Sequence, residues 1–413
     1  MNNLSDIFKV IPPMLCGQEL VDALTVLPEY HAEVCGLPAS ERLTALSNLY
    51  QVYLPSQMSL EIYSKLYLAL LRSLQKKGTK LAVHQQNQNR KAVLQQEYGG
   101  ILGGSDSFTI IGTSGIGKSS AINRAIYLIT QNRVVHSEDP YVKITPCVVV
   151  QCPFDSSVKG LLLEIMRKVD EVLDSRYYQN AVRARATTDM LIGSVSQVAL
   201  HHIGMLVVDE IQNVANSKNG KSLIGALTQL INNSGIAICM VGTPDSISFF
   251  QSAMQLARRS VGLQYNAMSY DGYFQNFCKL LFQYQYVKMP VEMTAGILEW
   301  LYEHSAGIAS VVVTLIHDAQ EIAILNGTEI LSLDELREAY ERRLSLMHGY
   351  IQPSIVHNHA SERKKKVPSL PNPVNRTECV EGKIAKLVTQ AKREGTDIVQ
   401  LMKSHVTVEE VTI

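Results

Sequence analysis

The sequence lacks several features that would by themselves indicate a function. Its 38 lysine and arginine residues equal its 38 aspartate and glutamate residues, so the formal net charge is zero. Bulk electrostatics therefore give no argument for nucleic-acid binding, and any basic surface must be local. The seven cysteines form no CxxC pair and show no His/Cys spacing of a zinc site. We expect them to be reduced thiols, most of them in a hydrophobic core.

Long apolar runs are also missing. The first residues do not combine a charged n-region with a long apolar h-region. No apolar run approaches the roughly 18 residues that a membrane-spanning helix needs. We therefore expect a cytoplasmic protein with no membrane partner. Over the whole sequence, 46% of the residues are hydrophobic and 18% are charged, which is typical of an ordinary globular protein.

The sequence pattern divides the chain into four segments. Residues 1–98 are expected to form a helical N-terminal extension, and residues 99–290 alternate short apolar strands with helical stretches. Residues 291–349 have a helical pattern throughout, which predicts a small all-α lid. Residues 350–413 combine prolines with a basic run, which is typical of a flexible linker and a partner-binding tail. Seven side chains of the extension share one helical stripe typical of a packing face: Leu60, Tyr63, Leu66, Tyr67, Leu70, Leu71 and Leu74.

Alternation of strands and helices indicates a parallel sheet that is covered by helices. The expected strands are 108–111, 147–151, 205–209 and 237–242, and 287–290 is the candidate for the last one. The prediction is an α/β fold with a parallel five-stranded sheet, flanked by helices and followed by the lid.

Residues 112–119, Gly-Thr-Ser-Gly-Ile-Gly-Lys-Ser, match the phosphate-binding pattern GxxxxGK[ST] between an expected strand and an expected helix. The glycines let backbone N–H groups converge on a phosphate, and the helix N-terminus adds partial positive charge. Lys118 is expected to reach the β- and γ-phosphates, and the Ser119 hydroxyl to bind magnesium. The nucleotide is ATP, with GTP as the alternative. The expected binding residues are Gly112, Thr113, Ser114, Gly115, Ile116, Gly117, Lys118, Ser119, Ser120 and Asp209.

Two carboxylates follow the buried strand at 205–209. Ligands bind at the carboxyl edge of open α/β sheets, so Asp209 is expected to hold the magnesium ion and Glu210 to polarise the attacking water. Thr243 follows the strand at 237–242, and its hydroxyl could orient the same water or cap the helix after Pro244.

Arg258 and Arg259 end an expected helix. Basic residues at a helix C-terminus interact favourably with the helix dipole, which is a sufficient structural reason for them. The functional alternative is an arginine finger that reaches the γ-phosphate of a neighbouring subunit. Both arginines are candidates.

These elements, in this order, resemble an AAA+ ATPase. More narrowly, Asp209-Glu210-Ile-Gln-Asn with Val-Gly-Thr243-Pro244 is similar to the TnsC/TniB family, the ATPase regulators of bacterial Tn-type transposons. The resemblance covers roughly residues 30–350. It leaves open whether a guide-RNA complex or a DNA-sequence reader recruits the protein.

The resemblance implies ATP-dependent rings or helical filaments of a homo-oligomer on double-stranded DNA. Such assemblies link a target-selector protein to transposase subunits, and hydrolysis dismantles them. By analogy the region between the second and third predicted strands faces DNA, and Lys159, Arg183 and Arg185 are the candidate phosphate contacts.

Three further expectations depend on the resemblance. Many AAA+ lids carry a sensor arginine after a glycine, whereas this sequence has Gly307-Ile-Ala-Ser310, so hydrolysis is expected to be slow or completed by a neighbouring subunit. The tail at 350–413 could capture the transposase. The target selector could dock on Tyr30, Tyr50, Tyr53 and Leu54.

Two other functions compete with transposition control. One is a replication initiator or loader, although about 65 residues after 349, interrupted by prolines, leave little room for a winged-helix domain. The other is a signalling NTPase whose nucleotide state switches partner binding without any DNA contact.

Overall fold

The computed structural model describes residues 11–77, 107–138, 141–214, 219–247, 250 and 262–349. The predicted arginine pair Arg258 and Arg259 and the predicted tail at 350–413 lie outside the described residues.

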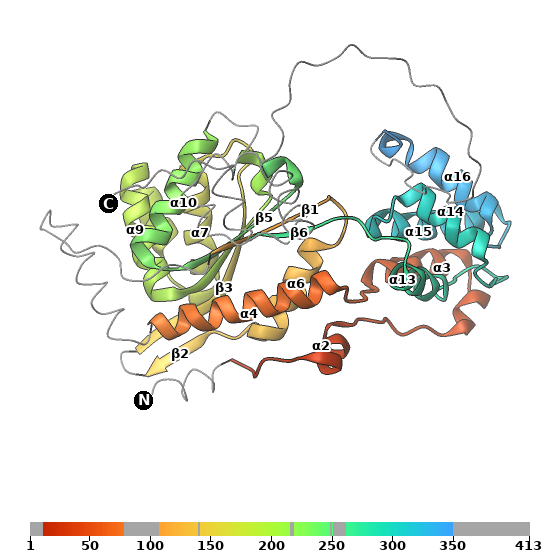
Figure 1. Cartoon of the computed structure of the whole chain (residues 1–413), viewed down its shortest axis with the longest axis horizontal. Helices are drawn as coiled ribbons and strands as arrows, with labels where there is room; N and C mark the ends of the chain where they lie inside the picture. Colours follow the sequence, from red (N-terminus) through yellow and green to blue (C-terminus); the bar gives the residue numbers. More distant parts are fainter. Residues whose placement is uncertain are drawn as a thin grey trace, which may run out of the picture. The chain divides into compact units, whose positions relative to one another are not determined.

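The central sheet has six strands in the order β2-β3-β4-β5-β1-β6 (Figure 1). From β3 to β6 all neighbouring strands pair in parallel, and β2 joins the edge of β3 in the antiparallel direction. The predicted parallel five-stranded sheet is confirmed, with one antiparallel strand in addition. The strands are β1 (Phe108–Gly112), β2 (Val135–Glu138), β3 (Tyr141–Gln151), β4 (Ile203–Asp209), β5 (Ala237–Gly242) and β6 (Leu263–Tyr265).

The prediction of the last strand was wrong. The fifth parallel strand is β6, which pairs with β1, and not the segment 287–290. Within that segment Met289 makes an isolated bridge with Ile330, and the next residue is Pro290, which has no N–H group to continue a ladder. Val287 is fully buried in the helical core instead.

Helices cover both faces of the sheet. Because successive strand residues point to opposite faces, Val148, Leu206 and Ile238 pack under α7, α9 and α10, whereas Val207 and Cys239 pack against α4 and α6. Figure 1 shows these two helical layers on either side of the strands. The described helices before the lid are α2 (Gly17–Leu24), α3 (Ala39–Ala45), α4 (Gln57–Lys77), α6 (Lys118–Thr130), α7 (Val158–Leu173), α8 (Tyr177–Arg183), α9 (Thr188–His202) and α10 (Gly220–Ser234), and of these α3 does not cover the sheet.

The predicted packing stripe lies on α4. Tyr63, Leu66, Tyr67, Leu70 and Leu74 are buried against the sheet and α6, as predicted. Polar contacts also join the helix to the sheet; for example, the Ser73 hydroxyl donates to the carbonyl oxygen of Gly204.

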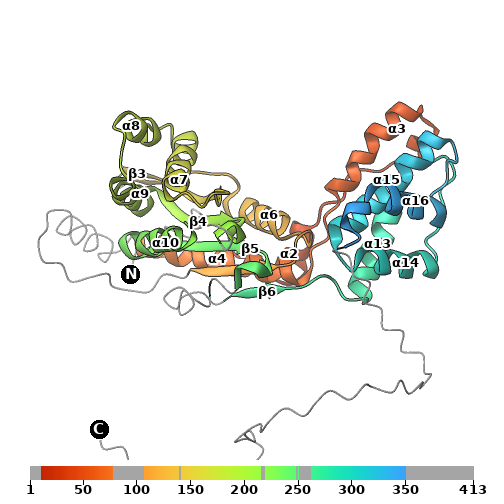
Figure 2. The same ribbon diagram turned by 90° about the horizontal axis from the view of Figure 1, so that it is seen from above.

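A second core belongs to the lid. Side-chain caps begin three of its helices: Asp271 accepts at the start of α13, Thr294 at α14, and Ser332 with Glu335 forms a capping box at α16. Leu46 and Leu49 of the N-terminal extension are buried in the same core, and α3 lies beside α15 (Figure 2). The helices of this core are α14 (Ala295–Ser305), α15 (Ala309–Asn326) and α16 (Leu333–Arg343) of the predicted lid at 291–349, together with α13 (Gly272–Phe282), which precedes that segment.

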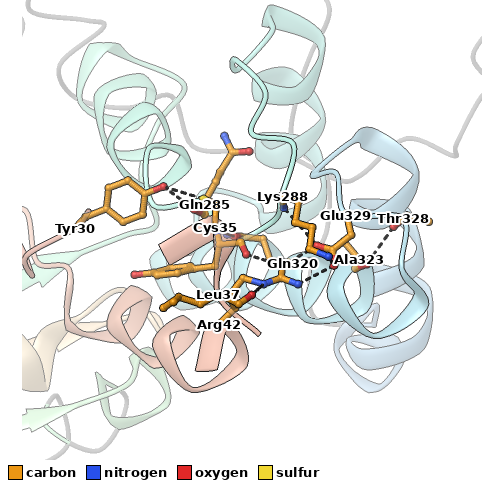
Figure 3. A network of polar contacts seen from close by, with 11 residues as sticks. Tyr30, Cys35, Leu37, Arg42, Gln285, Lys288, Gln320, Ala323, Thr328 and Glu329 are labelled. Atoms are coloured by element: carbon orange, nitrogen blue, oxygen red, sulfur yellow. Dashed lines mark hydrogen bonds and ion pairs between the residues drawn. The ribbon is translucent and has the colours of Figure 1, made fainter. Parts of the chain in front are cut away.

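A buried ion pair ties the extension to the lid (Figure 3). Arg42 of α3 is 1% exposed, and its two terminal nitrogens donate to the two carboxylate oxygens of Glu329 at 2.6 and 2.7 Å. The same guanidinium donates to the carbonyl oxygens of Leu37 and Tyr286. The hydrogen bonds from Arg42 hold the pKa of Glu329 below its usual value. All of these partners satisfy a charge that would be costly to bury alone.

Four of the cysteines in the described ranges are buried: Cys35, Cys152, Cys239 and Cys278. Burial raises the pKa of the Cys147 thiol to about 12, so that thiol stays protonated. In the part of the chain that the structure describes, no helix is both long enough and apolar enough to cross a membrane.

Candidate functional site

The predicted phosphate-binding loop connects β1 to α6. Gly115 and Gly117 have φ values of +82° and +93°, in the left-handed region that side chains disfavour. Gly117 is the residue before the first turn of α6. The loop therefore has the strand–loop–helix setting that the motif needs, at the carboxyl end of a central parallel strand.

Lys118 is the first residue of α6 and is nearly buried, with 9% of its surface exposed. Its ammonium group donates to the carbonyl oxygens of Gly112 at 2.7 Å and Thr113 at 2.9 Å. Burial lowers the pKa of Lys118, while the charges of Asp209 and Glu210 act in the opposite direction. The cation is thus held against the loop, close to two carboxylates.

The two predicted magnesium ligands are in contact. The Ser119 hydroxyl donates to a carboxylate oxygen of Asp209 at 3.0 Å, across 90 positions of sequence. The other Asp209 oxygen accepts from the backbone N–H of Glu210 at 2.8 Å. A hydroxyl and a carboxylate beside a phosphate-binding loop are the hard oxygen donors that Mg²⁺ prefers, so the residues present fit this ion.

Glu210 and Thr243 are linked through a residue that sequence reasoning did not assign. The Gln212 side-chain nitrogen donates to the Glu210 carboxylate, and its oxygen accepts from the backbone N–H of Thr243 at 3.2 Å. The Thr243 hydroxyl donates to Asp245 at 3.4 Å and does not cap the following turn. Gln212 belongs to the Asp-Glu-Ile-Gln-Asn stretch, but no periodicity or spacing in that stretch indicates its partner.

A cleft of about 880 Å³ adjoins the loop. Its wall includes residues of the N-terminal extension between 50 and 59, which sequence reasoning did not connect with the nucleotide site. Arg124 of α6 lies 5.4 Å from the ring centre of Tyr53 and donates to the carbonyl oxygen of Leu24. Tyr265, at the end of β6, donates to Glu61 at 2.8 Å. The cleft is therefore lined by aromatic and polar groups in fixed positions.

The lid closes the cleft through the start of α15. The backbone N–H of Ser310 donates to the carbonyl oxygen of Gly115 at 3.0 Å, and Ala309, Val313 and Thr314 also line the cleft. The stretch that lacks a sensor arginine therefore contacts the phosphate-binding loop directly.

The site residues lie within a segment that is similar to one protein family. Residues 104–266 match the bacterial TniB protein family. This segment runs from just before β1 to β6 and contains the loop, both carboxylates and Thr243, so the predicted resemblance is confirmed. A search of curated protein sequences finds no match.

Similar solved structures include two archaeal proteins. The Aeropyrum pernix ORC1 protein in complex with DNA is 14% identical, with a TM-score of 0.41 and coverage of 63% of this chain and 64% of that one. The ADP form of the A. pernix ORC2 protein is 15% identical, with a TM-score of 0.40 and coverage of 64% and 67%. Drosophila ORC bound to DNA is 11% identical, with a TM-score of 0.45 and coverage of 98% and 86%. The chain thus spans less than two thirds of the ORC1 chain, and at these values the similarity extends no further than the general fold.

The TniB-like segment also contains the three predicted DNA contacts, all exposed. Lys159 lies in the first turn of α7, Arg183 in the last turn of α8, and Arg185, with φ +48°, in the connection to α9.

Neighbouring polar residues have structural partners. Lys168 pairs with Glu171 at 3.3 Å, and the Tyr177 hydroxyl contacts His202 at 3.0 Å. The Thr187 side chain caps α9. Of the aromatic residues proposed to dock a target selector, Tyr30 donates to the carbonyl oxygen of Gln285, and Tyr50 is 56% exposed.

Proposed function

We propose that this protein is a magnesium-dependent ATPase that assembles on double-stranded DNA and regulates transposition. The observation that carries the proposal is the contact between Ser119 and Asp209 beside the loop, inside a segment that matches the TniB family. A nucleotide site of this kind, in a family of transposition regulators, points to ATP as the signal that controls assembly.

In this proposal each site residue has one task. Backbone N–H groups of the loop bind the β-phosphate, and Lys118 leaves the carbonyl oxygens of Gly112 and Thr113 to reach the γ-phosphate. Ser119 and Asp209 hold Mg²⁺, which when bound neutralises charge on the phosphate oxygens. Glu210 polarises the attacking water, and Thr243 helps to orient it. The cleft beside the loop receives the nucleoside.

The site is proposed to be completed by a second subunit. Arg258 or Arg259 of a neighbouring copy would supply the cation for the γ-phosphate, because the lid presents Ser310 and not an arginine to the loop. Hydrolysis that requires a neighbouring subunit is slow in isolated subunits. Such slow hydrolysis suits a protein that limits the lifetime of an assembly better than one that performs repeated mechanical work. ATP then holds a ring or helical filament together, and its hydrolysis dismantles it.

DNA is proposed to bind along the exposed residues Lys159, Arg183 and Arg185, which position the protein without reading sequence. The N-terminal extension and the tail at 350–413 are the proposed contacts for a target selector and a transposase. The chain carries no net charge, so the DNA contact must be local.

Electron microscopy with duplex DNA tests this function. Samples contain protein and DNA with ATP, with a non-hydrolysable ATP analogue, or with no nucleotide. Rings or filaments on DNA that need ATP or the analogue support the proposal. Absence of any DNA association in all three samples contradicts it and favours a signalling switch.

A further inference from the structure

We propose that Gln212 is a positioning residue for ATP hydrolysis, which rests on the function proposed above. Its amide nitrogen donates to the Glu210 carboxylate while its amide oxygen accepts from the backbone N–H of Thr243. One side chain thereby joins the ends of two neighbouring strands, β4 and β5, and it holds together the two groups proposed to act on the attacking water.

Glu210 needs such support because its backbone is fixed but its side chain projects from the end of a strand. Its φ is +58°, its N–H donates to Asp209, and its carbonyl oxygen accepts from Asn213 at 3.1 Å. The residue is exposed. A glutamate side chain has several rotatable bonds, and a water-activating carboxylate must keep one orientation to be effective.

The turn that carries Gln212 is rigid. Ile211 and Val214, on either side of it, are each 1% exposed. The side-chain amide of Asn213 donates to the carbonyl oxygen of Cys152 at 3.0 Å, and Ser156 donates to the Asn213 carbonyl oxygen at 3.1 Å. The amide of Gln212 is therefore presented from a fixed base.

The last residue of β5 leaves room for this amide. A Cβ atom on Gly242 would lie 3.0 Å from the Gln212 side-chain oxygen and 2.7 Å from Ile211. Glycine at this position thus permits the close approach by which Gln212 reaches the N–H of Thr243.

The bridge uses both halves of a side-chain amide. The NH2 group donates to the carboxylate while the carbonyl oxygen accepts from the N–H group, both at the same end of the side chain. Glutamate keeps the size but loses the donor and adds a like charge opposite Glu210. An isosteric replacement should therefore be at least as harmful as truncation, which is not expected of a side chain that only fills space.

The test compares ATP hydrolysis by the wild type, Gln212→Ala and Gln212→Glu, with DNA present. Gln18→Ala is the control, because Gln18 is an exposed residue of α2 that pairs with Asp22. We expect kcat to fall at least about tenfold in both Gln212 variants, which corresponds to about 1.4 kcal/mol. The two Gln212 variants should have the same KM as the control variant. Their dissociation constant for a fluorescent ATP analogue and their unfolding temperature should also equal those of the control variant.

A double-mutant cycle shows whether the effect passes through Glu210. In single-turnover assays Gln212→Ala should cause no further loss in a Glu210→Gln background. Three outcomes would each overturn the inference. Gln212→Ala could keep the wild-type kcat, or it could lower the single-turnover rate as much in the Glu210→Gln background as in the wild type. The third outcome is a Gln212→Glu variant as active as the wild type. A wild type that hydrolyses no ATP with DNA would instead overturn the proposed function itself.

Discussion

The backbone N–H of Ser310 donates to the carbonyl oxygen of Gly115 at 3.0 Å, which joins the first turn of lid helix α15 to the middle of the phosphate-binding loop. The two residues are packed so closely that a Cβ atom on Gly115 would lie 2.3 Å from the Ser310 hydroxyl oxygen. The phosphate-binding loop and the lid are therefore in direct contact at this point.

Gly115→Ala should weaken nucleotide binding by at least about tenfold, because its φ of +82° is strained for alanine and its methyl group displaces α15. Titration with a fluorescent ATP analogue measures the loss. Ser310→Ala removes the closest clash, so the double variant should recover part of the affinity. Gly225→Ala is the control, since nothing lies within 4 Å of the added atom. Equal affinities of Gly115→Ala and Gly225→Ala would show that loop and lid are not coupled.

Lys118→Ala should abolish nucleotide-dependent assembly on DNA, because the γ-phosphate loses its cation. The ammonium group is nearly buried against the loop, where it donates to the carbonyl oxygens of Gly112 and Thr113. Electron microscopy with the non-hydrolysable analogue is the measurement. Lys221→Ala, at an exposed position of α10, serves as the control and should assemble normally. Rings or filaments formed by Lys118→Ala would contradict the assigned role.

Glu210→Gln should bind ATP and DNA but keep the assembly from coming apart. The substitution preserves the size of the side chain and removes the carboxylate that is proposed to polarise water. Only the rate of ATP hydrolysis should therefore fall. Dissociation from labelled duplex DNA after excess unlabelled competitor gives the lifetime, which should lengthen at least about tenfold. If the variant released DNA as quickly as the wild type, Glu210 would not control disassembly.

Replacing Lys159, Arg183 or Arg185 by alanine should weaken DNA binding without affecting ATP binding. Each lost phosphate contact should reduce the slope of log K against log salt concentration by about 0.9. Arg167→Ala is the matched control, because the Arg167 side chain is engaged by Glu164 and Glu171 on the same surface helix. Salt titrations by fluorescence anisotropy measure the slopes. Identical slopes for all four variants would place the DNA elsewhere.

Arg42→Met should lower the free energy of unfolding by about 3 to 5 kcal/mol, because it leaves the carboxylate of Glu329 without its buried partner. The double variant Arg42→Met with Glu329→Gln should lose less than the single one. Urea unfolding provides the values, and additive losses would contradict coupling between the two residues.

The same pair predicts a pH dependence of stability. Arg42 lowers the pKa of Glu329 from its usual 4.5 in the folded state. The contribution of the pair is therefore complete above about pH 4.5 and is lost as the pH falls through the lower, folded value. The difference between wild type and Arg42→Met should shrink below pH 4.5 in the same urea experiments. A difference that is constant down to pH 3 would contradict the assigned contact.

The sequence alone was enough to predict the features that depend on short segments. The loop at 112–119 consists of eight consecutive residues, and its glycines and the helix that follows predict a strand–loop–helix conformation. The structure has this conformation. Strands β1, β4 and β5 were recognisable because they are short, apolar and buried on both faces. Ser119 and Asp209 were both predicted to hold magnesium, because ligands bind at the carboxyl edge of open α/β sheets.

Tertiary structure alone decided which distant groups meet. Strand β6 has three residues of mixed polarity and is a strand because β1 offers it an open edge. Gln212 meets Thr243 across 31 positions, and Ser310 of lid helix α15 meets Gly115. Such contacts depend on how whole elements pack. The residues next to a side chain in the sequence do not indicate which distant residue it will contact. The sequence thus predicted a phosphate-binding loop, and packing determined which groups surround it.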